Sequence, residues 1–139
     1  MELTPSRIGA RAEMEVAVAL TRAGKRVYAP FFAADSRVDL VYQDEDGFHR
    51  VQVKTSVLRG DVVYFRSCSN TNNVRRDYRG EADLIGVYSP ELEQVFLVPV
   101  DEAPGRGGHL RLTPARNGQA KGVRWAAKDY LIAPLQTEA

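Results

Sequence analysis

Two short strand-like segments, separated by a turn sequence, constrain the fold of this chain most strongly. Residues 38–42 are rich in β-branched and aromatic side chains, and in residues 50–55 polar and apolar side chains alternate, which is the pattern of a β-strand with one buried face. Between them lies an Asp-Glu-Asp-Gly sequence at 44–47, a composition typical of hairpin turns. The sequence therefore predicts an antiparallel hairpin over residues 38–55.

The register of this hairpin decides which polar side chains meet. A four-residue loop at 44–47 pairs Asp39 with Gln52, whereas a two-residue turn at 46–47 pairs Asp39 with Lys54. Gln52 and Lys54 are two residues apart and share a face, so either register brings both of them together with Asp39. The opposite, apolar face should meet the core, and it carries Val38, Leu40, Val51 and Val53.

A carboxylate, a carboxamide oxygen and an ammonium group on one sheet face suit phosphodiester hydrolysis. Mg²⁺ prefers oxygen ligands and uses only one or two carboxylates, and it can activate a water and stabilise the charge on a phosphate. A lysine can orient that water or stabilise the same charge. The alternative is an exposed sheet face on which Asp39 and Lys54 simply pair across the strands.

Residues 6–24 are predicted to form an amphipathic helix. A Thr-Pro pair at 4–5 suits its start, and Gly24 suits its end. Glu13 and Glu15 flank the apolar stripe on opposite sides, so periodicity leaves open which of them leans over the hairpin. The stripe itself consists of Ile8, Ala12, Val16, Ala19, Leu20 and Ala23.

The remaining elements complete the expected fold class. Further strands are predicted at 27–32, 61–66, 84–88 and 94–98. The Gly, Pro and Arg content of residues 101–119 predicts a loop. We expect an α/β (α+β) fold, with a single domain over residues 1–139 in which an N-terminal helix packs on a mixed central sheet.

The distribution of charge suggests a polyanionic partner, although the net charge is only +1. Between residues 103 and 128 there are six basic side chains and no acidic one, and arginines also cluster at 66–79. The alternative is a set of solvated surface loops. The residues expected to contact nucleic acid are Arg37, Arg75, Arg76, Tyr78, Arg79, Lys121 and Arg124.

The composition also excludes several classes of protein. No apolar run approaches the ~20 residues needed to cross a bilayer, and the N-terminus lacks the apolar segment of a signal peptide. The single Cys68 and two histidines exclude a disulfide framework and a cysteine-held zinc site. We therefore expect a cytoplasmic protein without a membrane partner.

The hairpin and helix residues together resemble the PD-(D/E)xK nuclease superfamily. In that superfamily, an acid near the end of one strand precedes an acid-x-Lys pair on the next strand, and a glutamate comes from a preceding helix. Here Asp39 follows Val38 rather than Pro, and Gln52 replaces the acid two residues before Lys54. The Gln-x-Lys version is similar to the branch that contains a group I intron-associated homing endonuclease. Further similar segments lie at 9–13, 51–55, 78–83, 88–100, 116–119 and 122–125, so the resemblance covers most of the chain.

This resemblance implies a restriction-endonuclease-like core and a Mg²⁺-dependent DNA endonuclease, with Mn²⁺ expected to substitute for Mg²⁺. It favours Glu13 over Glu15 as the helix glutamate. The implied metal ligands are Glu13, Asp39 and Gln52, and Lys54 completes the catalytic set. Double-stranded or branched DNA is the implied substrate, and a homo-oligomer, either a dimer or a tetramer, is expected because two strands need two active sites.

The motifs leave the type of activity open. The sequence-specific homing type and the structure-specific, junction-resolving type share the same fold and site. A third possibility is a catalytically inactive nucleic-acid-binding module, because Gln52 leaves the site with fewer negative ligands. Retention of both Glu13 and Lys54 argues against an inactive site.

Overall fold

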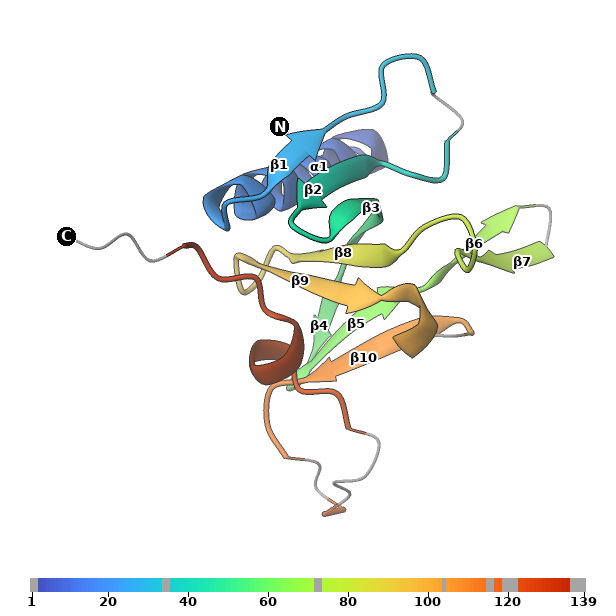
Figure 1. Cartoon of the computed structure of the whole chain (residues 1–139). Helices are drawn as coiled ribbons and strands as arrows, with labels where there is room; N and C mark the ends of the chain where they lie inside the picture. The colour runs from blue at the N-terminus through green and yellow to red at the C-terminus, as the bar shows by residue number, and fades with distance from the viewer. Residues whose placement is uncertain are drawn as a thin grey trace.

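The computed structural model describes residues 3–33, 36–71, 74–103, 105–114, 117–118 and 123–135. The chain begins with helix α1 (Pro5–Arg22), which lies against a central sheet, and a second layer of strands covers the other face of that sheet (Figure 1). The strands are β1 (Arg26–Tyr28), β2 (Leu40–Asp44), β3 (Gly47–Thr55), β4 (Val57–Arg59), β5 (Val62–Arg66), β6 (Cys68–Thr71), β7 (Val74–Asp77), β8 (Leu84–Ser89), β9 (Gln94–Pro99) and β10 (Gly107–Arg111). Two short helical turns follow β9 and β10, at Val100–Glu102 and Ala126–Tyr130.

Helix α1 confirms the helix expected from the apolar periodicity. Thr4 is its N-cap and accepts a hydrogen bond from the Arg7 N–H at 3.3 Å. Past its end, Gly24 adopts a φ of 84°, a conformation that residues with a side chain rarely take up. Of the helices in the described ranges, none is both long and apolar enough to cross a membrane.

The central sheet has the order β1-β2-β3-β8-β9 and is mixed, as expected. Strands β3 and β8 pair in parallel, and the other neighbours pair antiparallel. Strand β2 pairs with β3 from Leu40↔Val51 to Asp44↔Gly47. This is the register in which Asp39 would oppose Gln52, and it is closed by a two-residue turn at 45–46, which is neither the four-residue loop at 44–47 nor the two-residue turn at 46–47 that the sequence left open.

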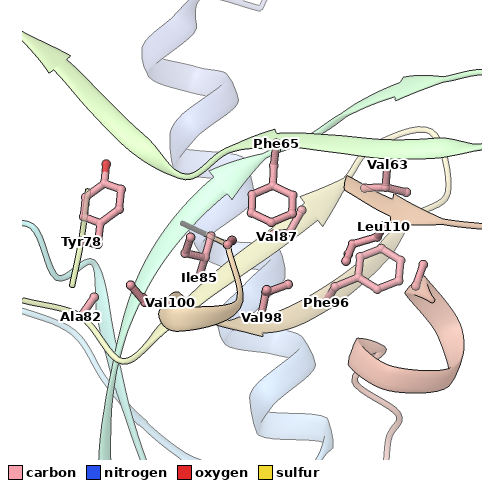
Figure 2. Packing of buried hydrophobic residues seen from close by; sticks show 12 residues of the cluster. Val63, Phe65, Tyr78, Ala82, Ile85, Val87, Phe96, Val98, Val100 and Leu110 are labelled. Atoms are coloured by element: carbon pink, nitrogen blue, oxygen red, sulfur yellow. The ribbon is translucent and has the colours of Figure 1, made fainter. Parts of the chain in front are cut away.

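Both faces of the central sheet are covered by apolar side chains. On one face, Ala12, Val16 and Leu20 of α1 pack against Leu40, Val51 and Val53, as the hairpin pattern predicts. Val38 is only half-buried. On the other face, side chains of β8 and β9 pack against β5 and β10 (Figure 2), and this cluster includes Val63, Phe65, Ile85, Val87, Phe96, Val98 and Leu110.

Two sequence-based expectations differ from the structure by more than a shift of a few residues at a strand end. Strand β1 ends at Tyr28 instead of continuing to 32, because Pro30 has no N–H to donate to a neighbouring strand. The expected loop at 101–119 contains β10, which pairs with β5. Its Gly108 lies directly against the Phe65 ring, where a side chain would clash. Glycine is therefore required in this strand by close packing, although in the sequence it is typical of a loop.

Candidate active site

The candidate site lies at the edge of β3, where its pairing with β2 ends. Strand β2 pairs no further along β3 than Val51, so the last residues of β3 extend past it. At this point the Asp39 N–H donates to the Val51 carbonyl at 2.9 Å, one residue away from the ladder register. The Asp39 carboxylate then accepts the Val53 N–H at 2.8 Å. The backbone of β3 thus holds Asp39 between the positions of Gln52 and Lys54.

This edge position makes the Asp39 carboxylate accessible from the helix side of the sheet as well. Glu13, on α1, interacts electrostatically with the Asp39 carboxylate, and this interaction raises the pKa of Glu13. Lys54 interacts electrostatically with the same carboxylate. Three of the four predicted catalytic side chains, Glu13, Asp39 and Lys54, are therefore brought together. Glu15 instead lines a different pocket, together with Arg22 and residues 131–134.

The electrostatics of the Glu13–Asp39 pair, hereafter the carboxylate pair, disfavour two negative charges. Burial raises the pKa of Asp39, and this outweighs the lowering effects of the Val53 N–H, Lys54 and Glu13. Burial also raises the pKa of Glu13, which keeps an exposed side, and the nearby Asp39 carboxylate raises it further. A cation at this position would favour the charged form of both carboxylates and so offset the burial that raises both pKa values.

Gln52 has an unusual environment for a carboxamide. Its Oε1 is buried and accepts no hydrogen bond from the described residues, while its Nε2 approaches the Val53 carbonyl at 3.4 Å. Gln52 and Lys54 share a face of β3, since they pair with Ile85 and Val87 of β8. Gln52 lines a pocket of about 420 Å³ together with Ser36, Arg37, Ser69, Val74, Arg76 and Tyr78.

The donor set fits a hard divalent cation. Two carboxylates, and a buried carboxamide oxygen that accepts no hydrogen bond within the described part of the chain, are oxygen ligands of the kind that Mg²⁺ and Ca²⁺ prefer. Within the described ranges, no group of three His, Cys, Asp or Glu side chains is positioned to hold a metal ion. This agrees with the replacement of the usual third acid by Gln52.

A buried aromatic ring supports the basic side chains of the site. Tyr78 is only 3% exposed and lies at the margin of the apolar cluster (Figure 2). The Lys54 Nζ lies 5.0 Å from its ring centroid and the Arg37 Cζ lies 4.2 Å from it, so the ring attracts both cations. Tyr78 was expected to contact nucleic acid, and its burial gives it mainly a supporting position.

Arg37 joins the loop before β2 to the β6–β7 hairpin. Its guanidinium donates to Glu81 at 3.2 Å, to the Ser69 hydroxyl at 3.1 Å and to the Arg76 carbonyl at 2.9 Å. Glu81 also pairs with the Arg76 guanidinium at 2.7 Å. Sequence reasoning did not identify Glu81. It pairs with Arg37, which lies 44 positions earlier, and with Arg76, which lies five positions earlier, and these pairings appear only once the chain is folded.

The other predicted nucleic-acid contacts do not all lie on this side. Arg75 and Arg76 are exposed on β7, and Arg79 pairs with Asp77 at 2.8 Å. Arg124 lines a separate pocket with Glu102, Asp129 and Tyr130. Lys121 lies outside the described residues.

Comparison with known proteins identifies the class to which this fold and site belong. The sequence model of the PD-(D/E)XK endonuclease family matches residues 4–132. The chain therefore belongs to this family, and it is a nuclease that hydrolyses phosphodiester bonds. This confirms the resemblance drawn from the helix, hairpin and later segments.

A solved structure supports the same assignment. The chain is similar to a bacterial homing endonuclease, I-Ssp6803I, with 27% sequence identity, a TM-score of 0.69 and coverage of 86% of each chain. The expected α+β fold, with an N-terminal helix on a mixed sheet, is thereby confirmed. A search of curated proteins finds no match.

Proposed function

We propose that this chain is a Mg²⁺-dependent DNA endonuclease in which Glu13, Asp39 and Gln52 hold the metal and Lys54 assists the reaction. The observation that carries the proposal is the Asp39 carboxylate, held at the end of the β2–β3 ladder by the Val53 N–H, with Glu13 and Lys54 both close enough to interact with it electrostatically. A purely structural site gains nothing from two carboxylates with raised pKa values at a sheet edge.

Each side chain has a defined task in this proposal. Asp39 is fixed by the Val53 N–H through one carboxylate oxygen, so its other oxygen is held in place and would be available to a cation. Glu13 approaches from α1 and closes the site on the helix side. Lys54, supported by the Tyr78 ring, offers an ammonium group that orients the attacking water or stabilises the charge that develops on the phosphate. When bound, a divalent cation supplies Lewis-acid stabilisation and makes a water more acidic.

DNA is the proposed substrate for two reasons. The similar solved structure is that of a homing endonuclease, a class of enzyme that acts on DNA. The exposed Arg76 of β7 also lines the pocket that Gln52 lines, and arginines suit phosphate contacts. We further propose a homo-oligomer as the active form, since cleavage of both strands requires two copies of the site.

The decisive variant is Lys54→Ala, with Lys25→Ala as a matched control. Lys25 is a partly exposed lysine whose Nζ lies 3.9 Å from Oδ2 of Asp44, at the turn end of the β2–β3 hairpin. Single-turnover cleavage should be lost in Lys54→Ala and kept in Lys25→Ala, while DNA binding in Ca²⁺ persists in both. Unchanged cleavage by Lys54→Ala would remove the proposed catalytic role of this site.

A further inference from the structure

Two neighbouring phenylalanines after β1 are almost fully exposed. Phe31 is 87% exposed and Phe32 is 93% exposed, the two highest values among the large exposed apolar side chains of the described residues. Their rings meet edge to face with centroids 4.4 Å apart. Hereafter we call them the aromatic pair. Because large apolar rings are rarely presented to water in this way without a partner, the pair marks a contact surface.

The aromatic pair belongs to the loop that leads directly to the candidate site. A turn follows it, in which the Ser36 N–H donates to the Ala33 carbonyl at 3.0 Å. Ser36 and Arg37 then line the pocket that Gln52 also lines, and Arg37 is bound to the β6–β7 hairpin. In Figure 1 this loop and the β6–β7 hairpin project from the same side of the molecule.

The charge around this surface favours a polyanion. The base of the loop is bound to β7, whose Arg75 and Arg76 side chains are exposed. Another exposed phenylalanine, Phe48, provides the contrast. Phe48 is 64% exposed, and its ring centroid lies 5.9 Å from that of Tyr28. It follows the acidic turn at 44–46. The loop that carries the aromatic pair is thus bound at its base to a hairpin with exposed arginines, of which Arg76 also pairs with Glu81, whereas Phe48 follows an acidic turn.

We propose that the aromatic pair stacks on nucleobases of the bound DNA beside the cleavage site, a contact that rests on the proposed DNA endonuclease function. Every base presents a π-face, so such stacking adds affinity without demanding one sequence. Apolar rings of this kind also insert between base steps and bend the duplex. The β7 arginines would bind the phosphates and position the DNA backbone, and the aromatic pair would stack on the bases.

The test separates stacking from phosphate binding. The double variant Phe31→Ala/Phe32→Ala is compared with Phe48→Ala, by measuring DNA affinity in Ca²⁺ over a series of salt concentrations. The double variant should bind at least about fivefold more weakly. The slope of log affinity against log salt should not change, because stacking releases no counterions. Phe48→Ala should match the wild type in both quantities.

A second probe removes the bases and keeps the phosphates. Single-stranded oligonucleotides are compared with abasic oligonucleotides of equal length. The wild type should bind the abasic strand more weakly, and the double variant should distinguish the two strands much less. Because the pair is exposed, the double variant should melt at the wild-type temperature.

Unchanged affinity in the double variant overturns the stacking proposal, and so does a changed salt slope. Conversion of an oligomer to a monomer with unchanged DNA affinity also overturns it, and assigns the pair to a contact between copies of the chain. The nuclease proposal is tested separately. If the wild type cleaves DNA and the double variant binds DNA as tightly as the wild type, only the stacking proposal is rejected. If the double variant binds DNA more weakly but the wild type cleaves none, only the nuclease proposal is rejected.

Discussion

Asp39→Asn is the substitution whose effects the structure defines most closely. The asparagine carbonyl can still accept the Val53 N–H that Asp39 accepts at 2.8 Å, so the end of the β2–β3 ladder should be kept. What changes is one negative charge and one strong oxygen ligand. The prediction is therefore about charge, with the geometry held nearly constant.

Two opposite effects on function follow from the loss of this charge. A ligated cation contributes several kcal/mol of transition-state stabilisation, and losing about 3–4 kcal/mol of it slows cleavage by about 10²–10³-fold. DNA binding without metal should improve. Two unit charges about 8 Å apart at an effective dielectric constant of about 20 repel by about 2 kcal/mol, so the gain is at most about 30-fold and falls with salt.

A third effect is visible without DNA. The raised pKa values of the carboxylate pair mean that the folded state binds protons more tightly than the unfolded chain. Asp39→Asn should therefore melt at a higher temperature than the metal-free wild type at neutral pH. Mg²⁺, Mn²⁺ or Ca²⁺ should raise the wild-type melting temperature and have much less effect on the variant.

The assays are single-turnover cleavage, DNA binding in EDTA and in Ca²⁺, and thermal melting with and without metal. Asp46→Asn is the matched control, because Asp46 is an exposed aspartate on the hairpin turn. A variant that cleaves at the wild-type rate would refute the reasoning. A wild-type melting temperature that no divalent cation changes would refute the metal site as well.

Four further predictions follow from the same structure. Metal-free stability should decrease as the pH rises from about 4 through the raised pKa values of the carboxylate pair, and divalent metal should abolish this dependence in thermal melting. Gln52→Glu should retain cleavage and lower the metal concentration for half-maximal rate, because an added carboxylate binds a hard cation more tightly. Tyr78→Leu should slow single-turnover cleavage by about 2- to 30-fold, whereas Tyr78→Phe, which keeps the ring beneath Lys54, should not. Arg75→Ala/Arg76→Ala should flatten the slope of log affinity against log salt by about 2, and an unchanged slope would place the DNA surface elsewhere.

Local patterns were sufficient to predict the elements that carry the site. The helix follows from apolar spacing and from Gly24, whose φ of 84° matches its position past the end of α1. The buried face of the hairpin follows from alternation, since Val51 and Val53 pack against the helix. The resemblance, rather than the periodicity, selected Glu13 over Glu15.

The edge position of Asp39 could not be predicted from alternation. The parity argument assumes that pairing continues through Asp39, but the ladder shifts there, and the carboxylate itself takes the Val53 N–H. It therefore lies at the strand edge, within reach of Glu13 on one side and Lys54 on the other. A local break in pairing of this kind depends on the loop before β2, which carries no alternating pattern.

Contacts between distant segments were also beyond sequence reasoning. The Tyr78 ring supports Lys54 and Arg37 only because the chain after β7 returns to β3. Likewise, β10 was missed because Gly108 is typical of a loop until the Phe65 ring is placed against it. In both cases the residue type is explained by a neighbour that is remote in the sequence.

The most direct test of the central claim is incubation of the wild-type protein with supercoiled, linear and branched DNA in Mg²⁺, Mn²⁺ and EDTA. We predict cleavage of at least one of these substrates in Mg²⁺ and in Mn²⁺, and none in EDTA. Preferential cutting of branched DNA would indicate the junction-resolving type, and cutting at a defined site in linear DNA would indicate the homing type. A protein that binds these DNAs but cleaves none of them with either metal would contradict the account, and would make the chain a nucleic-acid-binding module of the same fold.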